Sequence, residues 1–457
     1  MYECHCDYAL LPQGWAQDVR LRVGADGRLA AVDVGVARGT LPSAGRYVIP
    51  GMPNLHSHAF QRAMAGSAER FGRADDSFWT WREAMYAHAG RVSPDTLHAI
   101  ARWLYVEMLE AGYTRVCEFH YVHHQADGRP YAAAGAMCEA LRAAAQEAGI
   151  GLTLLPTLYQ RGGFADQPLS ARQRRFAQST EDFLRLLQSL DGATDLRLGA
   201  AIHSLRAVAE APLQQVVGDS LLRARPIHIH IAEQQLEVED CLRVHGQRPV
   251  ERLYALTQVD ARYCLVHATH VTPAEIEQMA RSQAVVGICT TTEANLGDGL
   301  FPLTALRAAG GRWGIGSDSH IGLDPREELR WLEYQARLGT GRRTVLADAA
   351  QPDVAANVWL AAVAGGAQAS GAAAAGLVAG ADADWLVLDD SHPSLAGAST
   401  DTMLATWMFA PCREGLRSVV VGGRERARQG QHPQREQAAA DYRRALAQLN
   451  AVGGAEH

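Results

Sequence analysis

Residues 47–58 read YVIPGMPNLHSH, an apolar run that ends in two histidines separated by one serine. Val48 and Ile49 are typical of a short buried strand, and the prolines and the glycine that follow distort its far end. Because side chains alternate between the two faces of an extended chain, His56 and His58 point the same way. Two imidazoles on one side of a strand end can form half of a metal site. The pair alone is weak evidence in a chain with 18 histidines, so the other strand ends decide its meaning.

Strand-like and helical segments alternate downstream of this run. Further apolar segments predict strands at residues 114–119, 151–156, 196–202, 226–230, 263–266, 284–289 and 311–316. Helical patterns are expected at residues 93–111, 131–148, 171–190, 213–222 and 325–337. Eight strands that alternate with helices predict an α/β fold, a (β/α)8 TIM-like barrel. A doubly wound open sheet has the same alternation and is the competing architecture.

The two ends of the chain have a pattern different from the middle. Short alternating strands are expected within residues 1–47, near 383–389 and near 418–423, and they can pair into one small β-sandwich domain. The predicted division is therefore the first part of the sandwich, the barrel, the second part of the sandwich and a helical tail, at residues 1–47, 48–375, 376–430 and 431–457. The long spacing between the first two barrel strands predicts a loop or helical insertion around residues 65–91.

Composition excludes several classes of function. The 457 residues are 47% hydrophobic and 20% charged, which is typical of a globular enzyme, and a net charge of -7 argues against a nucleic-acid partner. No signal peptide is visible in residues 1–16, and the Ala/Gly-rich residues 354–376 predict a packed helix and loop rather than a membrane span. Eight cysteines without a Cys-x-x-Cys motif favour a reduced, cytoplasmic setting.

All 43 basic residues of the chain are arginine. The protein therefore cannot use a Schiff-base lysine or a P-loop lysine. A carboxylated lysine that bridges two metal ions is excluded for the same reason.

Titratable side chains follow several of the predicted strands, where barrel enzymes hold their catalytic groups. They are His56 and His58 after the first strand, His203 with Arg206 after the fourth, His230 with Glu233 after the fifth, His267 after the sixth and Asp318 after the eighth. A single one of them could be a buried polar residue, and Asp318 could merely cap the next segment. Together they favour one mononuclear catalytic metal site. Its ligands would be His56, His58, His230 and Asp318.

This arrangement resembles the amidohydrolase superfamily over nearly the whole chain. Within it, the chain resembles the deaminase branch, which uses one metal and no lysine bridge, and His230-x-x-Glu233 is similar to the acid/base signature of that branch. Longer runs are similar to the formiminoglutamate deiminases of histidine degradation, at residues 52–66, 77–82, 118–124, 291–299 and 316–320. The resemblance implies hydrolysis of N-formimino-L-glutamate to N-formyl-L-glutamate and ammonia, with one divalent metal that is expected to be zinc.

The resemblance also implies catalytic roles. Asp318 would ligate the metal and accept the proton of the attacking water, and His267 would hold the hydroxide or the tetrahedral centre that forms. Glu233 would transfer a proton to the leaving nitrogen, so that ammonia departs.

The two carboxylates of such a substrate need cationic partners. Arg206 is the first candidate and Arg82 the second, because a guanidinium binds a carboxylate with two parallel hydrogen bonds. Gln61 and Tyr121 are candidates for hydrogen bonds to the α-amino or α-carboxylate group. His203 could meet the substrate beside Arg206 or only orient a loop. No role is assigned to His120, His123 and His124.

Two other functions stay open on the sequence alone. Another deaminase of the same branch would act on a guanidine, pterin or purine, and would need an aromatic-lined pocket with fewer cations. A non-catalytic metal-binding barrel would need only the metal ligands, and this function gives no reason for the presence of Glu233 and His267.

The expected binding partner of the protein is a small dicarboxylate, with no nucleic acid and no membrane. A homodimer is compatible with barrels of this kind, although no interface is identified.

Overall fold

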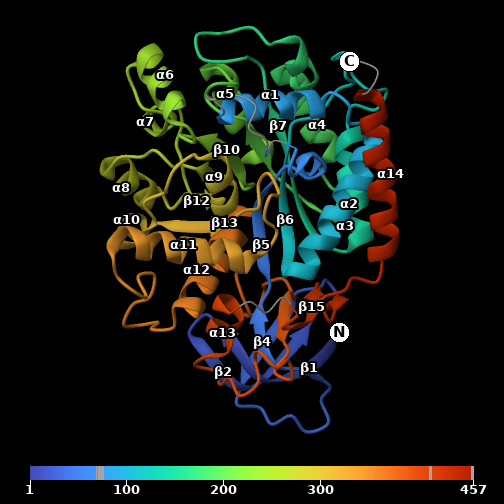
Figure 1. The fold of residues 1–457 in the computed structure, drawn as a ribbon, viewed down its shortest axis with the longest axis vertical. Coiled ribbons are helices and arrows are strands. Elements are labelled where there is room, and N and C mark those ends of the chain that lie inside the picture. The colour runs from blue at the N-terminus through green and yellow to red at the C-terminus, as the bar shows by residue number, and fades with distance from the viewer. Residues whose placement is uncertain (68, 70–76, 411–413, 454–457) are drawn as a thin grey trace.

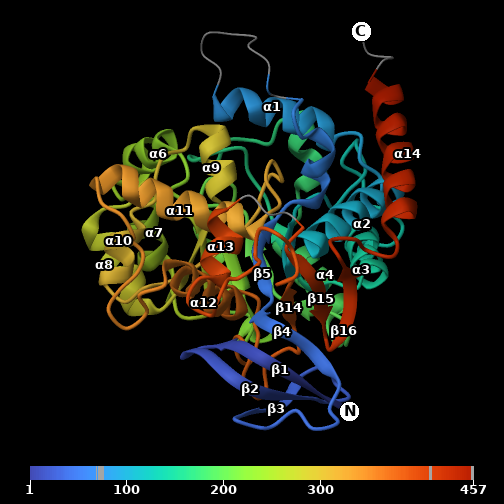
Figure 2. The same ribbon diagram turned by 60° about the horizontal axis from the view of Figure 1, so that its bottom comes forward.

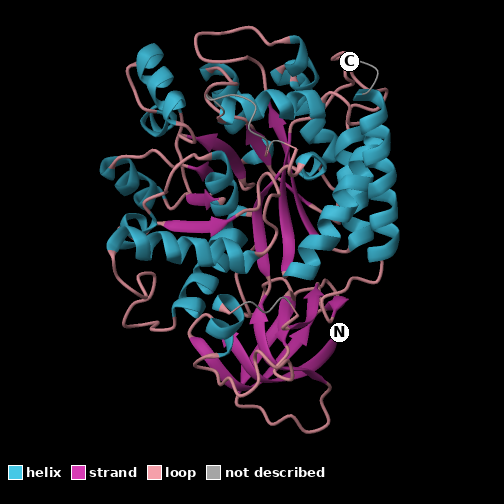
Figure 3. Ribbon diagram, viewed as in Figure 1, coloured by secondary structure: helices cyan, strands magenta, loops and turns pink. Residues whose placement is uncertain are grey.

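The computed structural model describes residues 1–67, 69, 77–410 and 414–453. A ring of parallel strands surrounded by helices forms the upper part of the molecule in Figure 1, and a second sheet lies below it. The strand and helix colouring of Figure 3 shows the two sheets as separate bodies. The predicted α/β fold with a (β/α)8 barrel is confirmed, and the doubly wound open sheet is wrong.

The barrel strands follow one another around the ring in chain order. They are β5 (Met52–Ser57), β6 (Tyr113–His120), β7 (Gly151–Leu158), β8 (Arg197–Leu198) with β9 (Ala200–Ile202), β10 (Ile227–Ile231), β11 (Tyr263–His267), β12 (Val285–Ile288) and β13 (Arg312–Ile315). Gly199 lies between β8 and β9, at a position where a side chain would collide with Leu155 and with the carbonyl of Pro226. An isolated parallel bridge between Ser57 and Asp318 joins the first strand to the segment after the last one.

The assignment of Val48 and Ile49 to the first barrel strand is wrong. Both lie in β4 (Ser43–Pro50), which pairs with β14 (Trp385–Leu388) in the lower sheet. The chain changes sheets at Gly51, where a side chain would collide with Thr114. The apolar run therefore contains two strands of different sheets, and the barrel begins at β5.

The lower sheet is built from both ends of the chain, as expected. Its seven strands are bonded in the order β16-β15-β14-β4-β1-β2-β3, so that one continuous sheet forms. The remaining bounds are β1 (Tyr2–Leu11), β2 (Gly14–Val23), β3 (Leu29–Val34), β15 (Leu416–Val421) and β16 (Arg424–Arg428). Buried side chains of this sheet form an apolar cluster that is separate from the barrel core. The cluster includes Leu21, Val48 and Trp385. Figure 2 shows this sheet below the barrel.

Most predicted helices are present with shifted ends. The helix expected at 93–111 is α2 (Pro94–Ala111), which Ser93 caps and after which Gly112 adopts a left-handed conformation. The segment 171–190 divides into a 3-10 turn (Ala171–Phe176) and α4 (Thr180–Leu190), because Ser179 accepts a hydrogen bond from Asp182 N and starts a new helix. The other barrel helices are α3 (Ala136–Ala148), α5 (Glu210–Val217), α6 (Gln235–His245), α7 (Pro249–Leu256), α8 (Pro273–Ser282), α9 (Thr290–Leu296), α10 (Leu303–Ala308), α11 (Pro325–Thr340) and α12 (Val354–Ala369). A short helix, α13 (Met403–Phe409), precedes β15.

The expected insertion after the first barrel strand contains a 3-10 turn (Ala59–Met64) and α1 (Phe78–Ala89). Residues 68 and 70–76 of this insertion lie outside the described residues. Figure 2 shows α1 above the end of the barrel that is far from the lower sheet. The predicted tail helix is α14 (Arg435–Gly453), which lies beside α2 in both views. Within the described part of the chain, no helix combines the length and the apolar character that a membrane crossing requires.

Candidate active site

The barrel closes at the residues that were predicted to bind metal. Asp318 N donates to His56 O at 3.0 Å and His58 N donates to Asp318 O at 3.3 Å, on either side of the Ser57–Asp318 bridge. Asn54 supports this closure, since its side chain donates to Ser317 Oγ at 2.7 Å and accepts from Ser317 N at 3.1 Å. The first strand and the segment after the last strand therefore hold each other in register.

Several residues at these strand ends have a left-handed backbone that L-residues rarely adopt. The φ angle is 50° at Ala232, 70° at His267, 49° at Ala268 and 43° at Asp318. Such conformations are unfavourable unless the surrounding structure imposes them, and they concentrate at functional sites. Here they turn the chain sharply at the ends of β10, β11 and β13.

Four side chains meet at the centre of the barrel mouth. His56 Nε2 lies 3.0 Å from His230 Nε2, and both His56 Nε2 and His58 Nε2 lie 3.4 Å from Asp318 Oδ1. His56, His58 and His230 offer nitrogen atoms within 4.8 Å of one another, and so do His56 and His267 with an oxygen of Asp318. All of these side chains are buried. Buried imidazoles that converge on one point with a carboxylate match the ligands of a divalent metal.

Neighbouring carbonyls orient two of these imidazoles. His58 Nδ1 donates to Phe119 O at 2.8 Å and His230 Nδ1 donates to His203 O at 3.0 Å, which leaves each Nε2 lone pair directed at the centre. Burial lowers the pKa of His56 to about 3, and it also lowers the pKa of His58 and of His230. All three rings are therefore neutral near pH 7, which is the form that binds metal.

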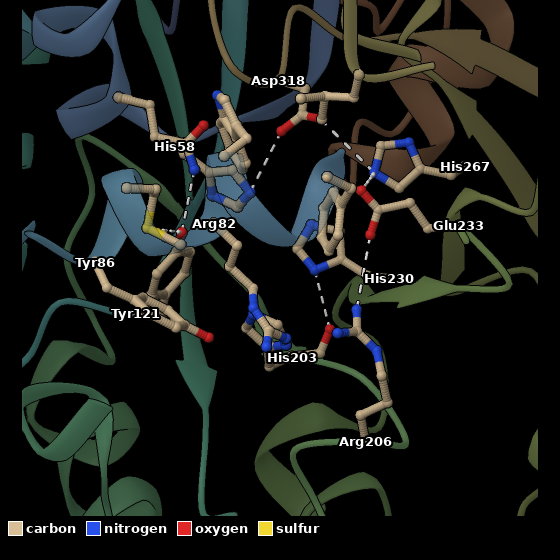
Figure 4. A pocket seen from close by; sticks show the side chains of 15 residues that line it. His58, Arg82, Tyr86, Tyr121, His203, Arg206, His230, Glu233, His267 and Asp318 are labelled. Atoms are coloured by element: carbon tan, nitrogen blue, oxygen red, sulfur yellow. Dashed lines mark hydrogen bonds and ion pairs between the residues drawn. The ribbon is translucent and has the colours of Figure 1, made fainter. Parts of the chain in front are cut away.

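Glu233 and His267 face each other beside this cluster, as Figure 4 shows. His267 Nε2 lies 3.7 Å from Glu233 Oε1 and 3.7 Å from Asp318 Oδ2. Burial raises the pKa of Glu233 to about 7, although the charges of His267 and Arg206 oppose this shift. Burial alone would lower the pKa of His267, but the carboxylates around it, those of Glu233, Glu293 and Asp318, outweigh burial and raise that pKa to about 10. Such a pair can exchange a proton with a bound substrate.

The other face of the cavity contains the residues predicted to contact a substrate. The whole cavity is lined by His58, Gln61, Phe78, Trp81, Arg82, Met85, Tyr86, Tyr121, His203, Arg206, His230, Glu233, His267, Leu296 and Asp318. All predicted site residues are in this set except His56, which lies behind it against His230. The structure therefore brings the predicted metal, acid/base and substrate residues into one cavity, between the barrel mouth and α1.

Hydrogen bonds and ion pairs organise the substrate side of the cavity. Gln61 Nε2 donates to the Tyr121 hydroxyl at 3.1 Å. Arg206 Nη2 lies 3.7 Å from Glu233 Oε2, and Figure 4 shows this guanidinium directed toward Glu233. Burial and the charge of Arg206 lower the pKa of His203 well below its usual value, so this ring is neutral.

Two acidic residues at the site were not predicted. Glu293 on α9 is buried and accepts hydrogen bonds from His267 Nδ1 at 3.3 Å and from Cys289 N at 3.0 Å. Glu237 on α6 is buried and lies 3.7 Å from Arg206 Nε. Glu237 lies in the first turn of α6, four residues after Glu233, and this short spacing was a usable signal. Glu293 lies within the run 291–299 that carries the family resemblance, but the resemblance assigns no role to it.

The histidines that were given no role lie outside the cavity lining. His123 Nε2 donates to Thr157 O at 2.9 Å and His124 Nε2 donates to Ala177 O at 2.8 Å. Burial lowers the pKa of His120 well below its usual value. These contacts join the loop after β6 to its neighbours.

Comparison with known sequences agrees with this geometry. The profile of the Amidohydrolase family matches residues 47–426. The chain belongs to the amidohydrolase family. A second profile, described as formimidoylglutamate deiminase HutF, N-terminal domain, matches residues 1–40 of this amidohydrolase. The resemblance inferred from the sequence runs is therefore confirmed.

Individual relatives of this amidohydrolase cover nearly its full length. Formimidoylglutamate deiminase from Pseudomonas aeruginosa is 51% identical over 447 residues, which is 96% of this chain and 98% of the relative. A 5-methylthioadenosine/S-adenosylhomocysteine deaminase from Natronomonas pharaonis is 28% identical over 401 residues, 86% of this chain and 84% of the relative.

Solved structures give the same picture of this amidohydrolase. The crystal structure of an amidohydrolase from Brucella melitensis has a TM-score of 0.93 at 44% identity, covering 98% of this chain and 100% of that one. An adenosine deaminase from Xanthomonas campestris with bound zinc has a TM-score of 0.79 at 21% identity, covering 98% of both chains. At this lower identity the likeness supports the fold alone.

Proposed function

We propose that this chain is a metal-dependent deiminase that hydrolyses N-formimino-L-glutamate to N-formyl-L-glutamate and ammonia, in histidine degradation. The observation that carries the proposal is one cavity that contains a metal-ligand cluster, the Glu233–His267 pair and two guanidiniums. The similarity to the formimidoylglutamate deiminase from Pseudomonas aeruginosa supports the same substrate.

The ligand set fits one divalent metal, and zinc is the ion we propose. His56, His58, His230 and Asp318 would hold it, since three neutral imidazoles and one carboxylate are donors that zinc accepts. The contacts of His56 Nε2 with His230 Nε2 at 3.0 Å and with Asp318 Oδ1 at 3.4 Å support this, because buried donor atoms that converge on one point match the ligands of a cation. A metal held there would supply Lewis-acid activation of a water molecule.

The protein's own side chains would then move the protons. Asp318 accepts the proton of the attacking water, because its Oδ2 faces His267 on the side open to the cavity. The charged His267 ring holds the oxygen that attacks the formimino carbon and stabilises the negative charge that develops there. Glu233 delivers a proton to the leaving nitrogen, for which a pKa of about 7 is well matched near neutral pH.

Arg82 and Arg206 would bind the carboxylates of the substrate. Both guanidiniums line the cavity, and a guanidinium can bind a carboxylate with two parallel hydrogen bonds. Gln61 and Tyr121 would hydrogen-bond the α-amino or α-carboxylate group, and His203 would contact the substrate beside Arg206.

An assay of ammonia release tests the proposal directly. N-formimino-L-glutamate is run beside guanine, a pterin, 5-methylthioadenosine and simple guanidino acids, with formylglutamate measured as the second product. We expect the highest kcat/KM with N-formimino-L-glutamate and loss of turnover after chelation of the metal. A better rate with any of the other substrates would refute the close assignment and leave a deaminase of the same branch.

The remaining parts of the proposal concern assembly and location. A homodimer stays a prediction. The seven cysteines in the described part of the chain are free and buried, which supports a reducing, cytoplasmic setting. The division into residues 1–47, 48–375, 376–430 and 431–457 stays a prediction, with β4 extending to Pro50.

A further inference from the structure

The indole of Trp79 lies against both cavity arginines. The guanidinium carbon of Arg82 is 4.4 Å from the ring centre of Trp79, and that of Arg206 is 5.8 Å from it. Trp79 and Arg82 are one turn apart on α1, whereas Arg206 comes from the loop after β9. One aromatic ring therefore contacts two cations that come from different elements of the fold.

The two guanidiniums have few other partners. Among the described residues, Arg82 forms no ion pair with a carboxylate, and its Nε is buried without a hydrogen bond. Arg206 Nε is also buried without a hydrogen bond, and the Glu233 and Glu237 carboxylates lie 3.7 Å away, beyond hydrogen-bond distance. Both cations thus keep donor groups free for an incoming anion.

Two like charges at one site repel each other. The carboxylates of Glu233 and Glu237 restrain Arg206, whereas Arg82 has no such partner among the described residues. The negative face of an aromatic ring attracts a cation, and a partly desolvated contact is stronger than an exposed one. Tyr86 adds a second ring, with its centre 5.5 Å from the guanidinium carbon of Arg82. Trp79 itself is outside the cavity lining, so it acts on the arginines from behind.

We propose that Trp79 is a specificity-determining positioning residue, whose indole holds the Arg82 and Arg206 guanidiniums together so that they receive the carboxylates of the substrate. This inference rests on the proposed function, because it assumes a dicarboxylate substrate. It assigns Trp79 a role in binding and none in the proton transfers at Glu233.

Replacement of Trp79 tests this role. In Trp79→Leu we expect the KM for N-formimino-L-glutamate to rise about 3- to 30-fold, the range of one cation–π contact, with kcat changed less than about 3-fold. The inhibition constant of glutarate, a dicarboxylate without the reacting group, should rise by the same factor. Trp79→Phe keeps an aromatic face and should retain most of the affinity.

A double-mutant cycle separates positioning from general damage. If Trp79 acts through Arg82, then Trp79→Leu has much less effect on KM in an Arg82→Met background than in the wild type. A matched control is Trp103→Leu, since Trp103 also has an arginine over its ring, Arg435 at 5.3 Å, and both residues are outside the cavity lining. This control should leave KM unchanged.

Several results would overturn the role of Trp79. They are an unchanged KM in Trp79→Leu, an equal loss in both backgrounds of the cycle, or a loss of kcat alone. If Trp79→Leu does not fold, Trp79→Met provides the same comparison with an apolar side chain of similar length. An inactive wild type would refute the proposed function, whereas an active wild type with an unaffected variant refutes only this inference.

Discussion

His267 Nδ1 lies 3.3 Å from Glu293 Oε1, and the same carboxylate oxygen accepts a hydrogen bond from Cys289 N. Glu293 is thereby fixed at the start of α9, and it fixes the His267 ring in turn. With Nδ1 committed to Glu293, Nε2 faces Glu233 and Asp318 across the cavity. The contact between His267 and Glu293 explains how the His267 ring, on a left-handed backbone, keeps one orientation.

Glu293→Gln is expected to lower kcat about 10- to 100-fold, the usual effect of mutating the buried hydrogen-bond partner of a catalytic group. The amide oxygen can still accept both hydrogen bonds, so the substitution removes the charge that stabilises protonated His267. Steady-state kinetics should show little change in KM, and metal analysis should show an unchanged content.

Glu333→Gln serves as the control for this substitution. Glu333 is also fully buried and accepts hydrogen bonds from Leu346 N and from Arg337, but it lies outside the cavity lining. Its loss should lower stability without changing kcat. A Glu293→Gln enzyme with wild-type kcat would show that the charge at this position is irrelevant to turnover.

Arg82→Met is expected to raise KM about 10- to 100-fold, because a hydrogen bond to a charged group contributes about 1.5–3 kcal/mol. Arg82 suits this test better than Arg206, whose removal would leave the buried Glu237 without its cation. Kinetics with N-formimino-L-glutamate measure the effect, and kcat should change much less than KM. An unchanged KM would mean that Arg82 does not touch the substrate.

The eight strands could be predicted because period and length are local properties of the chain. The convergence of the proposed metal ligands could be predicted from their places at strand ends, since a barrel brings all such ends together. The Val48–Ile49 error has a different cause. The apolar run continues through Gly51, and only the close approach of Thr114 shows that the chain changes sheets there.

Glu293 and Trp79 could not be assigned from the sequence for a related reason. Each acts through a partner distant in the chain, His267 for Glu293 and Arg206 for Trp79. Such pairs depend on side-chain directions and on the packing of separate elements. Their residue types and spacing carry no signal of the contact.

Stability should depend on pH through Glu328, a fully buried residue on α11 that accepts a hydrogen bond from Thr291 N at 3.0 Å. Burial raises the pKa of Glu328 from 4.5 to about 8. Between these two values the folded state holds a proton that the unfolded state has released. The free energy of unfolding therefore falls as pH rises from about 4.5 to about 8, by roughly 1.4 kcal/mol per unit of the shift at most.

Glu328→Gln mimics the protonated side chain and removes this dependence. Urea unfolding at pH 5, 6.5 and 8 should show the variant gaining stability relative to the wild type as pH rises. A difference between the two proteins that stays constant over this range would contradict a raised pKa at Glu328.

The proposed mechanism is tested most directly by measuring the turnover and the metal content of the Glu233→Gln variant. The substitution keeps the size of the side chain and removes the proton that Glu233 delivers to the leaving nitrogen. We expect kcat for ammonia release from N-formimino-L-glutamate to fall about 10²- to 10⁴-fold. The protein should keep one metal ion per chain, because Glu233 is outside the ligand cluster. Wild-type turnover in Glu233→Gln would contradict the mechanism.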